Sequence, residues 1–394
     1  MRLKSIKISV FITEPLKTRL VNLNLKKASA SFILIPNLRL FNKYLFLIGL
    51  FIGVISCSVK KDNNSLVLVP KNKYAKSFAI QKTDSLTFLH LINDSNITET
   101  YTITPSKKIK ETKYRVVCLT NTVLPYLEII DESNSIVGLA DMEYLHPSSK
   151  VLENEKIVNI GKNAQYDIET ILSLNPDFVF ISPEQVPQTN RLKTLGIKTI
   201  IVSEYLENHP LGKLEWIKFI STFYHKEQTA SHYLDSISKL YTNLTQIEKT
   251  TQKPTVFSGM CYNGSWSVSG GNSFVAQLIT DAGGIYNWNT NKSSGTVQLE
   301  YESVLEMAGN TDFWRIQVFS ESNPTYESLL KENKTFKNFK AFTNRKIVFV
   351  NTKKTDYFGK GIVEPHIILA DLIRIFHPTV LPNHKATYYQ VLDE

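Results

Sequence analysis

The sequence predicts an α/β protein with two Rossmann-like lobes. Each lobe has a largely parallel sheet, a single long helix joins the two, and a small β-meander precedes them. Strand and helix signals alternate along residues 111–208 and again along 251–394, which is typical of parallel sheets covered by helices. Between them, at 209–250, no strand signal occurs and apolar residues follow a helical spacing. Residues 57–394 also exceed one typical hydrophobic core, which favours two lobes.

Composition and periodicity divide the chain into segments with different expected roles. Short alternating segments at 78–81, 86–91 and 100–103 predict the meander, and the polar residues 60–64 predict a flexible tether before it. The expected segments are a leader with a lipoprotein signal peptide (1–56), a tether (57–73), the β-meander (74–110), an amino-terminal lobe (111–208), the connecting helix (209–250) and a carboxy-terminal lobe (251–394).

The segment before Cys57 predicts export. An uncharged apolar run at 44–56 follows the basic residues Arg39 and Lys43, and it is shorter than the roughly 20 residues that span a bilayer. Its end, residues 54–57, resembles the lipobox of bacterial lipoproteins. That resemblance implies that Cys57 is acylated and becomes the new N-terminus, which anchors the protein to the periplasmic or outer face of a bacterial membrane. An ordinary signal peptide with an incidental cysteine is the alternative.

The basic charge of the chain lies in the leader. The whole chain has a net charge of +9, and residues 1–56 carry nine Lys and Arg against one acid, which leaves +1 for residues 57–394. The exported part therefore gives no support to a nucleic-acid partner. The other two cysteines, Cys118 and Cys261, lie far apart and outside any CxxC pair, which predicts buried thiols rather than a zinc or redox site.

Each lobe shows its elements in order. Buried-strand and helix signals in the amino-terminal lobe fall at 115–119 (strand), 120–130 (turn and helix), 136–139 (strand), 168–174 (helix), 178–182 (strand), 188–195 (helix) and 199–203 (strand). In the carboxy-terminal lobe they fall at 254–258 (strand), 273–282 and 301–308 (helices), 313–319 and 346–350 (strands) and 365–376 (helix).

The connecting segment has one clear helical face. Apolar residues step by four and three along the chain, which predicts a helix of roughly 20 residues and about 30 Å, at positions Ala230, Leu234, Ile237, Tyr241 and Leu244. Its place between two α/β regions indicates a strut. A long surface helix of a single domain fits the same spacing.

The two lobes share a sequence pattern that suggests an internal repeat. In the first, Glu169 stands at the start of a helix and Asp177 precedes the next strand; in the second, Glu302 and Asp312 hold the same places. An acid in the first turn of a helix is stabilised by the helix dipole, so two unrelated glutamates are the alternative.

Taken in order, several segments resemble one family, the substrate-binding lipoproteins of ABC importers for ferric siderophores, haem or cobalamin. The resemblance covers 74–392, and the segments that carry it are 115–120, 160–161, 167–180, 195–197, 266–273, 282–284 and 369–378. It implies two α/β lobes joined by one long helix, with the ligand in the cleft between them. It also implies that Glu169 and Glu302 are exposed, one on each lobe, and pair with arginines of the permease. Such complementary charges orient and speed docking, although each surface pair adds little affinity.

The cleft should be lined by loops at the carboxyl ends of the strands. Those loops nominate as ligand-binding residues Thr120, Asn121, Tyr144, His146, Tyr262, Trp266, Tyr357 and Phe358. Bulky planar ligands are held mainly by aromatic area, and Trp266 is the strongest aromatic candidate because 263–265 predict an exposed loop before it. Core packing is the alternative for each aromatic residue.

These observations predict a monomeric binding protein without a cofactor, whose cargo is a ferric siderophore, or else a corrinoid or haem. The nearest alternative is a zinc- or manganese-binding lipoprotein of an ABC importer, which would need several converging ligands such as His146, His209, Glu300 and His366. An enzyme is disfavoured because neither a GxSxG elbow nor a GxxxxGK[ST] loop occurs. A further alternative is a surface lipoprotein that captures nutrients or adheres without an importer.

Overall fold

The structure is a computed structural model that describes residues 72–104, 113–162, 164–247 and 252–393. These residues all lie in one of the two compact units of the chain, 67–394. The leader, the lipobox cysteine Cys57 and most of the tether lie outside the described residues. No helix of the described part is both long enough and apolar enough to cross a membrane.

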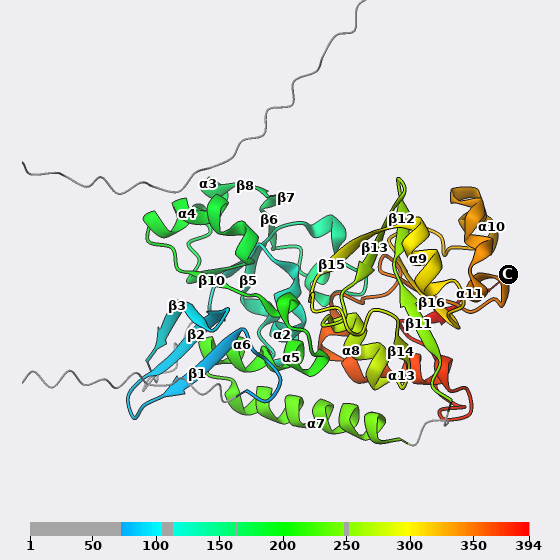
Figure 1. Cartoon of the computed structure of the whole chain (residues 1–394). Coiled ribbons are helices and arrows are strands. Elements are labelled where there is room, and N and C mark those ends of the chain that lie inside the picture. Colours follow the sequence, from blue (N-terminus) through cyan, green and yellow to red (C-terminus); the bar gives the residue numbers. More distant parts are fainter. Residues whose placement is uncertain (1–71, 105–112, 163, 248–251, 394) are drawn as a thin grey trace, which may run out of the picture. The chain divides into compact units, whose positions relative to one another are not determined.

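The predicted meander is present as a sheet of its own (Figure 1). Strands β1 (Phe78–Lys82), β2 (Thr87–Asn93) and β3 (Asn96–Ile103) pair antiparallel in sequence order. The β2–β3 turn places Asp94 and Ser95 at φ of 46° and 67°, and positive φ at both central residues matches the twist of a hairpin.

Two buried glutamates, one of the amino-terminal lobe and one of the connecting segment, hold the chain that leads into the meander. The Glu215 carboxylate accepts hydrogen bonds from the backbone N–H of Lys73, Tyr74 and Ala75, at 2.8–3.0 Å. Glu207 accepts from the backbone N–H groups of the next two residues and from the indole Nε1 of Trp216. Because unpaired buried N–H groups are costly, these carboxylates fix the start of the meander to the lobe.

The amino-terminal lobe has the predicted parallel sheet, with strand order β10-β9-β4-β5-β6. Its strands are β4 (Val116–Cys118), β5 (Ile136–Leu139), β6 (Val158–Asn159), β9 (Phe178–Ile181) and β10 (Thr199–Ile201). A short hairpin, β7 (Gly161–Lys162) with β8 (Gln165–Tyr166), precedes helix α3, and the helices are α2 (Leu124–Ile129), α3 (Ile168–Ser173) and α4 (Val186–Thr194).

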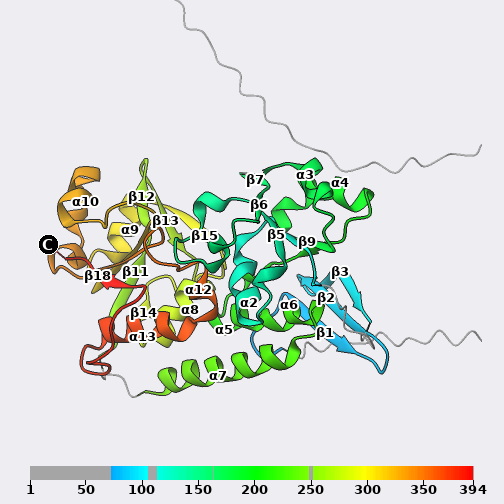
Figure 2. The same cartoon turned by 180° about the vertical axis from the view of Figure 1, so that it is seen from behind.

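The connecting segment contains three helices rather than one: α5 (Pro210–Glu215), α6 (Ile217–Phe223) and α7 (Glu227–Gln246). The left-handed backbone of His225, at φ 54°, ends the helical run before α7. Helix α7 has the predicted 20 residues and buries the predicted apolar face. It packs against α6 of the same segment and against α13 of the carboxy-terminal lobe, as both views show (Figures 1 and 2).

The carboxy-terminal lobe has a second five-stranded sheet in the order β14-β11-β16-β17-β18, parallel except for its last strand. The strands are β11 (Thr255–Ser258), β14 (Ile285–Tyr286), β16 (Phe313–Val318), β17 (Ile347–Asn351) and β18 (Gln390–Val391). The helices are α8 (Phe274–Asp281), α9 (Tyr301–Ala308), α10 (Tyr326–Glu332), α11 (Lys340–Thr343), α12 (Lys360–Val363) and α13 (Pro365–Phe376).

The carboxy-terminal lobe also contains an antiparallel sheet that was not predicted from the sequence. It pairs β12 (Met260–Tyr262), β13 (Ser265–Ser269) and β15 (Thr296–Glu300). The expected exposed loop at 263–265 is therefore a tight hairpin turn, with Asn263 and Gly264 at φ of 50° and 81°. The Asn-Gly pair is the sequence signal for such a turn, since both residues tolerate positive φ.

The expected exposure of Trp266 is wrong for the same reason. Strand β13 points its indole inward, where it is 0% exposed. Its ring lies 5.3 Å from that of Phe339 and 5.5 Å from that of Trp314, and its Nε1 donates to the Ser258 carbonyl at 3.3 Å. Trp266 is thus part of the aromatic core of the lobe.

The proposed internal repeat has a structural counterpart at the amino edges of the two sheets. Asp177, before β9, accepts a hydrogen bond from the Arg115 N–H at 2.8 Å, just before β4. Asp312, before β16, accepts from the Thr255 N–H at 2.9 Å, at the start of β11. In both lobes, therefore, an aspartate that precedes one strand accepts a backbone hydrogen bond from the start of the neighbouring parallel strand.

Candidate ligand cleft and docking surfaces

The two parallel sheets each have a topological switch point, where open α/β sheets bind ligands at the carboxyl ends of the strands. In the amino-terminal lobe the order reverses between β4 and β9, and in the carboxy-terminal lobe between β11 and β16. The nominated residues Thr120 and Asn121 follow β4 directly, and Tyr357 and Phe358 lie in the loop after β17.

Loops from the carboxyl edges of both sheets meet at one small cavity. Its volume is about 30 Å³, and it is lined on one side by Asn121, Leu124, Pro125, Glu128, Leu145, His146, Ser149 and Val151, and on the other by Asp356, Gly359 and Lys360. His146 Nε2 lies 3.1 Å from the Lys354 carbonyl oxygen and so joins the two lobes beside the cavity. This volume suits one or two waters, not a cargo.

Asn121 is the best supported of the nominated residues. Its Nδ2 donates to the Asp141 carbonyl at 3.2 Å, whereas its Oδ1 is buried with no hydrogen-bond partner among the described residues. A buried acceptor that lacks a partner is costly, so this oxygen is an available contact for a water or a ligand at the cavity.

The other nominated residues differ in how exposed their side chains are. Tyr144, Tyr262 and Phe358 are exposed, at 53%, 78% and 54%, whereas Thr120 is half-buried with its hydroxyl 3.2 Å from that of Thr122. Tyr357 is buried, and its hydroxyl lies 3.2 Å from that of Tyr389. In the described conformation the core-packing alternative therefore holds for Tyr357 as it does for Trp266.

Charged residues that the sequence analysis missed are buried at the carboxyl edge of the first sheet. Glu204 follows β10 and is fully buried, and burial raises the pKa of its carboxyl against the opposing effects of Thr122 and Lys213. Burial likewise lowers the pKa of Lys213, whose Nζ lies 4.7 Å from the ring centroid of Phe274 in helix α8. The signal was present, because Glu204 comes directly after the predicted strand 199–203.

In the second sheet the buried charge is Arg315, in the middle of β16. Burial opposes its charge, but the surrounding tyrosine hydroxyls, led by Tyr389, raise its pKa overall. The pattern of β16 gave no reason to expect a buried guanidinium, since a central strand of a parallel sheet is ordinarily apolar.

The two predicted docking glutamates are exposed, as expected, and each lies in the first turn of its helix. Glu169, in α3, has 76% of its side chain exposed and pairs with Arg191 at 3.2 Å. Glu302 is exposed at the start of α9. An exposed ion pair such as Glu169–Arg191 contributes little, so it leaves the carboxylate available to another partner.

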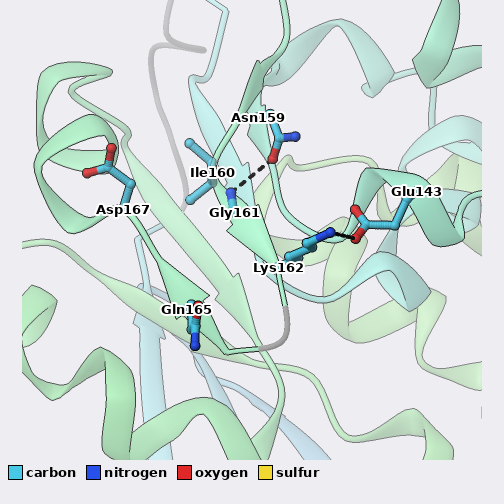
Figure 3. A pocket seen from close by; sticks show the side chains of 7 residues that line it. All are labelled: Glu143, Asn159, Ile160, Gly161, Lys162, Gln165 and Asp167. Carbon is cyan, nitrogen blue, oxygen red and sulfur yellow. Dashed lines mark hydrogen bonds and ion pairs between the residues drawn. The ribbon is translucent and has the colours of Figure 1, made fainter.

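A cavity larger than the interlobe one lies within the amino-terminal lobe (Figure 3). It holds about 390 Å³ and is lined only by the amino-terminal lobe: Glu143, Asn159, Ile160, Gly161, Lys162, Gln165 and Asp167. Within it, Lys162 Nζ pairs with Glu143 at 3.0 Å, and the Gly161 N–H donates to Asn159 Oδ1 at 2.9 Å. With no residue from the second lobe, it is not the interlobe cleft.

The residues proposed for direct metal binding do not converge in the described part of the chain, which holds no group of three His, Cys, Asp or Glu side chains that could share an ion. His209 is used locally: its ring stacks on Tyr74 at 4.5 Å, and its Nδ1 accepts from the Leu211 N–H at 3.0 Å. Cys118 is a buried free thiol and Cys261 a half-buried one.

The fold and these sites agree with the comparison to known families. Residues 116–353 match the Periplasmic binding protein family, and because the match spans more than half of the chain, the protein belongs to this family. The predicted class, a substrate-binding protein of ABC importers, is thereby confirmed. The meander, at 78–103, lies outside the matched region.

The individual proteins compared with this chain have low sequence identity to it. Over 295 residues the chain is 28% identical to an uncharacterized lipoprotein of Methanocaldococcus jannaschii, MJ0878, covering 70% of this chain and 68% of that protein. An ABC transporter substrate-binding protein of Listeria monocytogenes aligns with a TM-score of 0.54 and 16% identity over 68% of this chain and 100% of its own. The periplasmic haem-binding protein HutB of Vibrio cholerae aligns with a TM-score of 0.54 and 19% identity over 66% of this chain and 98% of its own. At these identities the solved structures show the shared fold.

Proposed function

We propose that this protein is the substrate-binding lipoprotein of an ABC importer and that it carries a ferric siderophore between its lobes to the membrane permease. A corrinoid or haem is the alternative cargo of the same cleft. The observation that carries the proposal is the meeting of carboxyl-edge loops from both sheets at one place, where Asn121 and His146 face Asp356 and Lys360.

Cargo entry requires the lobes to separate along this edge. The described conformation leaves only about 30 Å³ there, and the His146 contact to the Lys354 carbonyl closes it from one side. Separation would expose Asn121 Oδ1 and bring the exposed rings of Tyr144 and Phe358 within reach of a bulky ligand. These residues, with Thr120, His146 and Tyr262, are the proposed contacts; Trp266 and Tyr357 support them from the core.

The location and the partner follow from two further features. Cys57 is proposed to carry the lipid, which is in keeping with the relative described as a lipoprotein. Glu169 and Glu302, exposed on separate lobes, are proposed to face positive charges of the permease. Mass spectrometry of the mature protein tests the first claim: an acylated Cys57 at the N-terminus is expected, and an unmodified Met1 would contradict it.

Calorimetric titration of the mature protein tests the cargo. The probes are ferrichrome, iron(III) citrate, cyanocobalamin and haemin, with Zn²⁺ and Mn²⁺ as the controls for the alternative. We expect one organic complex to bind with 1:1 stoichiometry and the bare ions not to bind. A stoichiometric ion bound without a chelator would favour the metal-ion carrier, and no binding by any probe would count against a cargo of this class.

A further inference from the structure

The hydrogen-bond partners of the buried Arg315 are neutral groups. Its Nε and one terminal nitrogen donate to the Tyr389 hydroxyl at 2.9 and 2.7 Å, and the same terminal nitrogen donates to Gln317 Oε1 at 3.1 Å. The guanidinium carbon also lies 5.4 Å from the ring centroid of Tyr389. Tyr357 and Tyr286 complete the surrounding hydroxyls. Every acceptor recorded is neutral.

The positive charge of this group has no carboxylate to balance it. Among the described residues, the groups that act on the Arg315 charge are tyrosines and not acids. The buried acid of the same lobe, Asp371, is already bonded to His384 and to the backbone N–H groups of Thr387, Tyr388 and Tyr389. An arginine cannot shed its proton, and a buried charge without a counter-charge is expensive, so the site is a pre-formed cation that lacks its anion.

The site lies where a ligand could reach it. Arg315 pairs in register with Ser258, the last residue of β11, and therefore stands at the switch point between β11 and β16. Gln317, two residues nearer the carboxyl edge on the same face of β16, is exposed and its amide oxygen covers the guanidinium. Tyr357 beside it belongs to the loop whose Lys354 carbonyl meets His146 of the other lobe and whose Asp356 lines the interlobe cavity.

We propose that Arg315 is the anion-binding group of the carboxy-terminal lobe and that the cargo carries a carboxylate or a comparable oxyanion, which replaces the Gln317 amide oxygen on the guanidinium. The proposal rests on the proposed function and narrows its cargo. Arginine is suited to this exchange because its planar fork binds a carboxylate through two parallel hydrogen bonds. The Tyr389 hydroxyl would hold the guanidinium in place while the acceptor changes.

Matched probe pairs test the proposal on the mature protein. Haemin is compared with its dimethyl ester, which has the same ring without free carboxylates, and iron(III) citrate with the neutral complex ferrichrome. Wild type is expected to bind the carboxylate-bearing member of at least one pair more tightly. Arg315→Gln should weaken that binding by about 10- to 100-fold, as the loss of a charged hydrogen bond does, and should leave the neutral partner unaffected. Arg315→Lys should retain part of the affinity.

The control variant is Arg374→Gln, whose guanidinium bonds to the Pro378 carbonyl on helix α13 and which should bind all probes as wild type does. Equal binding of both members of each pair, preference for the neutral members, or unchanged binding by Arg315→Gln would overturn the anion site and leave the proposed function standing. No binding by any probe would overturn both. If Arg315→Gln does not fold, the wild-type melting temperature decides: it must rise with a carboxylate-bearing probe more than with its neutral partner.

Discussion

The two lobes repeat one another at the amino edges of their sheets and differ at the carboxyl edges. Asp177 and Asp312 fasten the neighbouring strand in the same way, and Glu169 and Glu302 stand in the first turn of corresponding helices. At the carboxyl edges, by contrast, the first lobe buries the acid Glu204 near Lys213, and the second buries Arg315 without an acid. The repeated aspartates serve the architecture and the repeated glutamates are the proposed docking residues, whereas the divergent edges are where ligand specificity can differ.

The sharpest test of the symmetry is charge reversal of both docking glutamates. We expect Glu169→Lys with Glu302→Lys to abolish cargo uptake in cells and to leave cargo affinity unchanged, because both carboxylates are exposed and neither lines the interlobe cavity. Each single reversal should have an intermediate effect. The matched control is Glu327→Lys, an exposed glutamate in the first turn of α10. Normal uptake by the double variant would remove the docking assignment.

Trp266 tests the aromatic core of the carboxy-terminal lobe. Trp266→Ala should lower the free energy of unfolding by about 3–5 kcal/mol, because it removes a fully buried indole from the aromatic core. Urea denaturation measures the loss. Tyr262→Ala, four residues away and 78% exposed, should change stability by less than about 0.5 kcal/mol. A stable Trp266→Ala protein with weakened cargo binding would instead indicate that Trp266 contacts the cargo in the cleft.

The Glu215 carboxylate holds the chain that leads into the meander, and a substitution tests how much it contributes. Glu215→Ala leaves three backbone N–H groups without their acceptor, and an unsatisfied buried group costs about 1–3 kcal/mol. We expect faster hydrogen exchange at 73–75 and in β1, with protection of the carboxy-terminal sheet unchanged. Lys218→Ala is the control: it removes the side-chain partner of Glu215 but spares the backbone bonds. Unaltered exchange at 73–75 in Glu215→Ala would show that other contacts hold the meander.

Asp312 predicts a small acid-dependent effect on stability. Burial alone would raise the pKa of Asp312, but hydrogen bonds from Lys340 and Thr255 outweigh it and hold the pKa at about 2, below the ordinary 3.8. Its contribution is therefore present above pH 3.8 and is lost as the pH falls toward about 2. Asp312→Asn should be less stable than wild type by about 1 kcal/mol at pH 7, and the difference should shrink near pH 2. A difference independent of pH would contradict this account.

Much of this organisation could be predicted from sequence because it follows from periodicity. The strands at 136–139 and 178–181 and the helices at 301–308 and 365–376 were marked by apolar runs and helical spacing. The exposure of Glu169 and Glu302 was implied by the resemblance to the family and is confirmed. The hairpin at 263–264 could also have been predicted from its Asn-Gly pair, and with it the inward direction of Trp266.

The candidate site was less predictable, because burial of a charged residue is decided by distant segments. Arg315 is surrounded by Tyr286, Tyr357 and Tyr389, which come from three separate parts of the chain. Glu207 and Glu215 are buried because residues 73–77 cross over them, and no local pattern reveals that contact. Loops could be placed at the carboxyl edge from strand ends, but which of their side chains turn inward depended on the other lobe.

The central claim is that cargo binds between two lobes that separate and close. Spin labels on two exposed positions, Leu195→Cys in the first lobe and Met307→Cys in the second, would report the interlobe distance by pulsed electron resonance, with Cys261→Ser to remove the half-buried thiol. We expect the distance distribution to shift and narrow when a cargo that binds by calorimetry is added. An identical distribution with and without that bound cargo would contradict the claim.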